Sequence, residues 1–280
     1  MKTRVITGVV GGLFAVLVLC FMHTVALPVV VSMFCVIAVY EMETVSGLKN
    51  FPIMIVTLLL SATIPFVFHF RIAFSKQIYI VSAIAYTLIL FLLMLLLYEK
   101  TKFEQVVIAL FSSIAIPGSI SIVILLRDIY IKYPNYTKSE AVFLVLLALF
   151  TSWLTDAFAF FAGKKFGKHK MCPNISPKKT VEGAIGGIAG QALLSLVLFY
   201  VFNKFFFTEE SYLSYTSVIL LSVFLSAISM CGDLTASTVK RNYGVKDFGT
   251  FFPGHGGVMD RFDSCLFVLP ALYAFAIITA

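Results

Sequence analysis

The chain of 280 residues is 60% hydrophobic and only 12% charged, with a formal net charge of +7 and a mean hydropathy of +0.99. This composition excludes an ordinary soluble domain. The positive charge lies beside apolar runs rather than in a nucleic-acid-binding motif, so we expect no nucleic-acid partner. Because helices satisfy their own backbone hydrogen bonds inside hydrocarbon, we predict an all-α, polytopic integral membrane protein.

Apolar runs recur along the whole chain, and those of about 17 residues or more are long enough to cross the ~30 Å hydrocarbon core of a bilayer. We predict about nine transmembrane helices in a single membrane domain, residues 1–280. Their expected ranges are 5–22, 24–40, 51–70, 78–98, 106–126, 141–163, 183–201, 215–232 and 264–280.

Lysine and arginine are divided unequally between the two sides that these spans define. The N-terminus and the loops 41–50, 99–105, 164–182 and 233–263 carry 15 of the 21 basic residues, and the other side carries 6. Cytoplasmic loops of membrane proteins are enriched in Lys and Arg. We therefore predict a cell-membrane protein whose N-terminus and two long polar loops, 164–182 and 233–263, face the cytoplasm.

Asp156 is an ionisable residue inside the sixth predicted span. Such a group is costly in a membrane unless it is paired. One possible partner is a lysine near the end of the span, Lys164 or Lys165. We favour the alternative, a polar cavity that Asp156 shares with three downstream carboxylates, Asp233, Asp260 and Asp263.

Lys178 and Lys179 precede a glycine-rich segment that is predicted to begin a helix. Free N–H groups at a helix start favour phosphate, which supports a phosphate-binding role for the two lysines. The alternative is that they only set the topology of the next span. Thr180 or Glu182 could in the same way only cap that helix.

Residues 233–263 hold nine ionisable side chains, five glycines and a proline between two apolar runs, so we predict a loop here. Asp260 and Asp263 are three residues apart where the last run begins, and in a helix they would share a face of its first turn. Carboxylates next to cations suit a polyphosphate held through Mg²⁺, because carboxylate oxygens bind the metal and Lys and Arg bind phosphate oxygens. A solvated connecting loop is the alternative.

The order S-x-x-K-R-x4-K-D-x-G-x3-P-G-H-G-G-x-x-D-R-x-D, from Ser237 to Asp263, resembles the signature of the phosphatidate cytidylyltransferase (CDP-diacylglycerol synthase) family. TDAFAFFAGKKFGKHK at 155–170 and ISPKKTVEG at 175–183 resemble that family's other long motif. Ala236 and Val181 stand where the family often has Glu and Trp, so those two roles are not carried over.

The resemblance implies roles for the polar residues. We assign the metal ligands as Asp233, Asp260 and Asp263, supported by Asp156, and the catalytic residues as these three aspartates with Lys240, Arg241 and Arg261. Candidate substrate-binding residues are Lys178, Lys179, Glu182, Ser237, Lys246, Asp247 and His255. His255 either carries a proton or shapes the loop. Mg²⁺ is the implied cofactor, and whether a second cation joins it stays open.

The implied activity is transfer of a cytidylyl group from CTP to phosphatidic acid, which gives CDP-diacylglycerol and pyrophosphate for phospholipid biosynthesis. The implied partners are CTP, phosphatidic acid, membrane lipid and a second copy of the chain in a homodimer, with the active site facing the cytoplasm. One alternative is a CTP-dependent polyprenol or phytol kinase. An anion transporter is the alternative from a different class.

Overall fold

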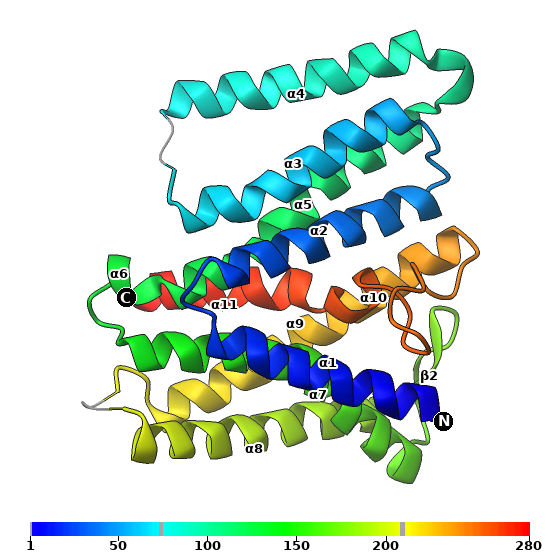
Figure 1. Cartoon of the computed structure of the whole chain (residues 1–280). Helices are drawn as coiled ribbons and strands as arrows, with labels where there is room; N and C mark the ends of the chain where they lie inside the picture. Colours follow the sequence, from blue (N-terminus) through cyan, green and yellow to red (C-terminus); the bar gives the residue numbers. More distant parts are fainter. Residues whose placement is uncertain (1, 73–74, 208–210) are drawn as a thin grey trace. The chain divides into compact units, whose positions relative to one another are not determined.

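The computed structural model describes residues 2–72, 75–207 and 211–280 (Figure 1). Helices dominate these ranges, which confirms the all-α prediction, and one small antiparallel hairpin joins β1 (Lys170–Cys172) to β2 (Ser176–Thr180). The chain divides into two compact units, Met1–Ile124 with Tyr243–Asp260, and Leu125–Asn242 with Arg261–Ala280. The sequence predicts one membrane domain, and each of the two units contains several helices of membrane-spanning length.

Eight helices within the described ranges are long and apolar enough to cross a membrane, and a shorter apolar helix covers Thr7–Cys20. These nine helices correspond to the nine predicted spans. The class of polytopic helical membrane protein is therefore confirmed. The many exposed Leu, Ile, Val and Phe side chains on these helices are typical of surfaces that face lipid.

The first unit contains α1 (Lys2–Cys20), α2 (Ala26–Val45), α3 (Phe51–His69), α4 (Lys76–Leu96), η1 (Tyr98–Lys100) and most of α5 (Phe103–Arg127). α2 packs on α3, and the Ser32 hydroxyl donates a hydrogen bond to the Ala62 carbonyl across that pair at 2.8 Å. Segment 243–260 belongs to this unit although it follows in sequence much later. The buried apolar cluster of the unit is formed by Leu48, Ile53, Leu90, Val106 and Ala109.

The second unit contains α6 (Ile129–Lys132), α7 (Lys138–Phe166), the β1–β2 hairpin, α8 (Val181–Phe205), α9 (Tyr215–Asn242) and α11 (Cys265–Thr279). α7 packs along both α8 and α9, and α11 packs on α9 and α7. A capping box of Thr137 and Glu140 begins α7, so that each side chain satisfies a backbone N–H group of the other residue. The short α10 (Met259–Phe262) lies where the chain passes from one unit to the other.

Glycine lets α8 approach α7 closely. A Cβ atom at Gly183 would lie only 2.8 Å from the Ala159 carbonyl oxygen. At Gly187 it would lie 2.8 Å from the Thr155 carbonyl oxygen. Because small residues allow the backbones of membrane helices to pack against each other, the glycine-rich start of α8 is required for the α7–α8 interface.

Replacing Gly183 with alanine is expected to destabilise the protein by about 1–3 kcal/mol, since the added methyl group has no space. In a detergent-solubilised sample the apparent melting temperature should fall by roughly 2–10 °C. Gly118 in α5 is the matched control, because a Cβ atom there meets nothing within 4 Å. Equal melting temperatures for the Gly183→Ala and Gly118→Ala proteins would contradict the packing role of Gly183.

Several helices extend beyond their predicted ends, and α9 and α2 do so by the most. α9 continues to Asn242, so Asp233, Ser237, Lys240 and Arg241 are helical and the prediction of a loop over their positions is wrong. Their spacing repeats every three to four residues, which places them on one side of the helix. α2 likewise continues to Val45 instead of ending at residue 40.

The last span also differs from the prediction. The helix is interrupted at 263–264, between α10 and α11, so Asp260 and Asp263 do not share the first turn of one continuous helix. This break places Asp263 outside a regular helix.

Candidate active site

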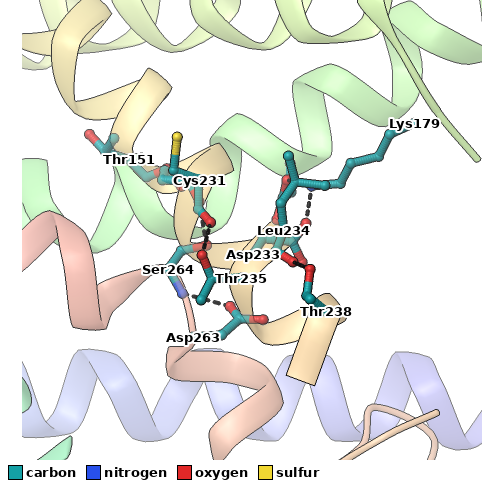
Figure 2. A network of polar contacts seen from close by, with 11 residues as sticks. Thr151, Lys179, Cys231, Asp233, Leu234, Thr235, Thr238, Asp263 and Ser264 are labelled. Carbon is teal, nitrogen blue, oxygen red and sulfur yellow. Dashed lines mark hydrogen bonds and ion pairs between the residues drawn. The ribbon is translucent and has the colours of Figure 1, made fainter. Parts of the chain in front are cut away.

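Lys179 joins two carboxylates of the second unit that are far apart in the sequence. Its ammonium group forms ion pairs with Asp233 of α9 and with Asp156 of α7, the latter at 3.4 Å. Figure 2 shows the Lys179 side chain extended from its strand toward Asp233. Asp156 is therefore paired inside its span, as its position requires, but its partner is neither Lys164 nor Lys165.

Strand geometry explains why Lys179 points inward and its neighbour does not. Successive residues of a strand point to opposite faces. In β2, Lys178 is exposed and Lys179 is partly buried against the two carboxylates. Thr180 then ends the strand and caps α8, because its hydroxyl oxygen accepts the Gly183 N–H at 3.1 Å. Of the two residues considered as caps for this helix, Thr180 is the one whose side chain caps it.

The end of α9 brings further positive charge to the same unit. Lys240 lies seven residues after Asp233, two helical turns along the same face, and is 9% exposed. Arg241 is exposed, and its Nε donates to the Ile175 carbonyl oxygen at 3.4 Å. This contact connects the C-terminal end of α9 to the turn of the hairpin that carries Lys179. Ser237 lies on α9 between Asp233 and Lys240.

Asp263 is buried at the helix break, with only 7% of its surface exposed. One of its oxygens accepts the Ser264 N–H at 2.7 Å (Figure 2). The charges of Lys240, Arg261 and Asp156 lie within electrostatic range of its carboxylate. Asp263 is therefore part of the same group of charges as the pair around Lys179.

Trp153 fixes the backbone next to this break. Its indole Nε1 donates to the Arg261 carbonyl oxygen at 3.0 Å, and its ring meets Phe262 edge to face. The Ser264 hydroxyl donates to the Ser229 carbonyl oxygen on α9 at 3.1 Å. The Arg261 side chain itself is exposed. Sequence reasoning overlooked Trp153, although it is the single tryptophan of the chain.

The first unit holds the glycine-rich part of the motif, and there Asp260 is engaged by its own loop. Asp260 is 8% exposed, and its Oδ2 accepts the N–H groups of Phe248 at 2.7 Å and Gly257 at 3.0 Å. Lys246 and Asp247 are exposed. Of the four aspartates expected to share one cavity, Asp156, Asp233 and Asp263 belong to the second unit, whereas Asp260 belongs to the first and binds its own loop.

His255 shapes the loop through its backbone, because its N–H donates to the Phe252 carbonyl oxygen at 2.8 Å. Its imidazole Nδ1 is buried and has no hydrogen-bond partner among the described residues. Buried polar atoms normally have a partner. The described residues therefore leave the hydrogen-bonding capacity of this nitrogen unused.

Glu182 is occupied by neighbouring backbone. Its carboxylate accepts the N–H groups of Lys168 at 3.0 Å and His169 at 3.2 Å, and it pairs with the His169 ring at 2.6 Å. These bonds order the segment that leads from α7 into the hairpin. Glu182 thus positions the strand that carries Lys178 and Lys179.

The carboxylates of the second unit fit a hard divalent cation in their chemistry. Asp156 and Asp233 already share one positive charge, and Asp263 lies within electrostatic range of Asp156. No group of three or more His, Cys, Asp or Glu side chains in residues 2–72, 75–207 and 211–280 is arranged to enclose a metal by itself. Mg²⁺ usually keeps several waters and binds through one or two carboxylates plus substrate phosphates, so such an enclosure is not required.

The membrane-spanning helices define a polytopic membrane protein, and its second unit brings together the charged side chains of Lys179, Asp156, Asp233 and Asp263. A family model described as "Cytidylyltransferase family" matches residues 2–279, and the chain therefore belongs to the cytidylyltransferase family. This match agrees with the resemblance that the two motifs indicate.

Relatives of the chain include bacterial phosphatidate cytidylyltransferases. The chain is 46% identical to that of Bacillus subtilis (strain 168) over 129 residues, which cover 46% of the chain and 45% of the relative. The relative from Staphylococcus saprophyticus is 42% identical over 142 residues, covering 50% and 51%, and that from Staphylococcus haemolyticus is 43% identical over 136 residues, covering 49% and 50%. The chain thus spans about half the length of the curated relatives it matches.

Proposed function

We propose that the protein transfers a cytidylyl group from CTP to phosphatidic acid and so makes CDP-diacylglycerol for phospholipid biosynthesis. The observation that carries the proposal is the meeting of Asp156, Lys179 and Asp233, from three separate elements, inside a member of the cytidylyltransferase family. The relatives named phosphatidate cytidylyltransferase support the choice of lipid substrate.

In this reaction an oxygen of the lipid phosphate forms a bond to the α-phosphorus of CTP. The bond between that phosphorus and the bridging oxygen breaks, and pyrophosphate leaves with the electron pair. A phosphate monoester has a second pKa of about 6 and is largely ionised at neutral pH, so no strong protein base is needed. The main obstacle is repulsion between two polyanions, which positive groups of the protein must offset.

Lys179 and Lys240 supply this positive charge from inside the unit. Lys179 is held by two carboxylates, and a bound phosphate oxygen would compete with them for its three N–H donors. Arg241 and Lys178 are exposed and provide contacts at the outer edge of the site. Arginine can bind phosphate through two parallel hydrogen bonds, which suits Arg241 to orienting a substrate.

Asp156, Asp233 and Asp263 are the residues of the second unit that would hold Mg²⁺. When bound, the ion neutralises phosphate charge and acts as a Lewis acid toward the transferring group. The negative charge of these carboxylates would be balanced by the ion when the Lys179 ammonium group binds the substrate instead of Asp156 and Asp233. Asp260, with two backbone bonds on one oxygen, contributes by holding the loop and is the weaker candidate for a ligand.

The cytoplasmic orientation, the plasma membrane location and a homodimer are further parts of the proposal. The excess of 15 over 6 basic residues supports the orientation, the bacterial relatives support the location, and the family resemblance supports the dimer.

A cysteine introduced at position 246 should react with an impermeant reagent only from the cytoplasmic side.

The two alternatives are a CTP-dependent lipid kinase and an anion transporter. The named relatives favour cytidylyl transfer over both. The deciding experiment gives the purified protein CTP, phosphatidic acid and Mg²⁺ and measures pyrophosphate and the lipid product. We expect one pyrophosphate for each CDP-diacylglycerol. CDP release with a polyprenol, or anion flux into vesicles without pyrophosphate, would reject the proposal.

A further inference from the structure

Glu41 is a buried carboxylate in a helix of membrane-spanning length. It lies near the end of α2 and is only 6% exposed. An ionised carboxylate taken out of water needs hydrogen-bond donors or a cation nearby. Nothing in the signature motifs includes this residue, and the sequence alone suggests a polar loop at this point.

The donors come from the glycine-rich motif loop, defined here as residues 248–260 of the same unit. The Val258 N–H donates to Glu41 Oε1 at 3.1 Å, and the Met259 N–H donates to Oε2 at 2.9 Å. The first N–H groups of a helix have no partners within it, and α10 begins at Met259. Glu41 thus satisfies donors that would otherwise be left unpaired in a buried position.

Two glycines of the loop make room for this carboxylate. A Cβ atom at Gly249 would lie 2.2 Å from Glu41 Oε1, and a Cβ atom at Gly257 would lie 2.3 Å from Oε2. Neither glycine has a positive φ, so the need for glycine at these positions is a matter of space. The loop is wrapped around the Glu41 side chain.

Asp260 holds the same loop from within. Its Oδ2 accepts the N–H groups of Phe248 and Gly257, which lie at opposite ends of the loop. The Gly257 bond is adjacent in the chain to the bonds that Glu41 makes with Val258 and Met259. Two carboxylates therefore hold four backbone N–H groups of one short segment.

We propose that Glu41 is a positioning residue that holds the motif loop, and with it Asp260 and His255, in the geometry that the reaction needs. The proposal rests on the cytidylyl transfer proposed above for its kinetic consequences. Its structural part, that Glu41 holds the loop in the conformation described here, does not depend on the reaction and is tested separately.

The kinetic test is a double-mutant cycle between Glu41→Ala and Gly249→Ala. Each single variant is expected to lower kcat about tenfold or more, the first by removing the acceptor and the second by pushing the carboxylate aside. The KM for CTP should change less than about threefold, because the loop is displaced rather than the substrate contacts removed. With Glu41 absent the methyl group meets no carboxylate, so the double variant should be no slower than Glu41→Ala.

Proteolysis provides a readout that needs no activity. Phe251 in the loop is 48% exposed, and chymotrypsin cleavage there reports local opening. Cleavage should be at least about fivefold faster in Glu41→Ala than in the wild type, and the double variant should match Glu41→Ala. Gly118→Ala serves as the control for an added methyl group in open space.

Glu41→Gln is the second variant and is used if Glu41→Ala does not insert into the membrane. It keeps the size of the side chain, but its amide can accept only one of the two N–H groups and places its NH₂ against the other. We expect the kcat and the cleavage rate of Glu41→Gln to lie between those of the wild type and those of Glu41→Ala. Independent, multiplicative effects of Glu41→Ala and Gly249→Ala, or wild-type cleavage of Glu41→Gln, would overturn the proposal. If the wild type lacks transferase activity, the cleavage rates alone decide.

Discussion

Replacing Asp263 with asparagine is expected to lower kcat by about 100-fold or more while the amount of inserted protein stays unchanged. Asparagine has the same shape, and its amide oxygen can still accept the Ser264 N–H that the aspartate binds at 2.7 Å. What is lost is the negative charge, which is nearly buried and lies near Lys240 and Arg261. The variant therefore separates charge from packing.

The measurement is CTP-dependent pyrophosphate release with phosphatidic acid, together with size-exclusion chromatography to monitor folding. Glu104→Gln is the matched control, because it also removes one carboxylate but lies exposed at the start of α5. Asp263→Asn activity above roughly a tenth of the wild-type value would argue against a metal or phosphate role for this residue.

Lys179→Met is expected to be as severe, with a loss of about 100-fold or more in kcat/KM. Methionine preserves much of the length of the side chain but leaves Asp156 and Asp233 facing each other without a cation between them. Because like charges then repel in a partly buried place, we also expect a lower melting temperature. Lys179→Arg, which keeps the charge, should recover stability better than activity.

Lys178→Met provides the comparison, since the same chemical change is made one residue earlier on the opposite face of β2. Lys178 is exposed and makes no contact with the two aspartates, so we expect a smaller loss, seen mainly in KM. Lys102→Met at an exposed position is the control for removal of one basic charge. Equal losses for positions 178 and 179 would reject the specific role of Lys179.

The membrane class and the long apolar helices of the described residues could be predicted because hydrocarbon imposes strong constraints on both composition and length. Helix ends were harder, and α9 illustrates why. Its charged residues after Asp233 suggest a loop, but their helical spacing puts them on one side of a continuous helix. The three-to-four-residue spacing of these side chains, considered together with their charge, predicts that α9 continues past Asp233.

The pairing of side chains could not be predicted, because it depends on how separate elements meet. The sequence assigned Asp156 and Lys179 to the site, but nothing in their local patterns indicates that they pair. Glu41 was overlooked for a related reason. It stands far from the motifs in sequence, and the one available signal was an acidic residue within a segment that can be helical.

The wrapping of the motif loop around Glu41 has a consequence for how the family's sequences vary. Gly249 and Gly257 are constrained by a residue more than two hundred positions away, so the three positions should change together during evolution. In relatives in which position 41 is small or apolar, larger residues should be tolerated at both glycines. Where position 41 is acidic, both glycines should be retained. An alignment of full-length relatives can test this covariation directly. If it is found, the carboxylate at position 41 belongs to the family's sequence signature together with the two glycines.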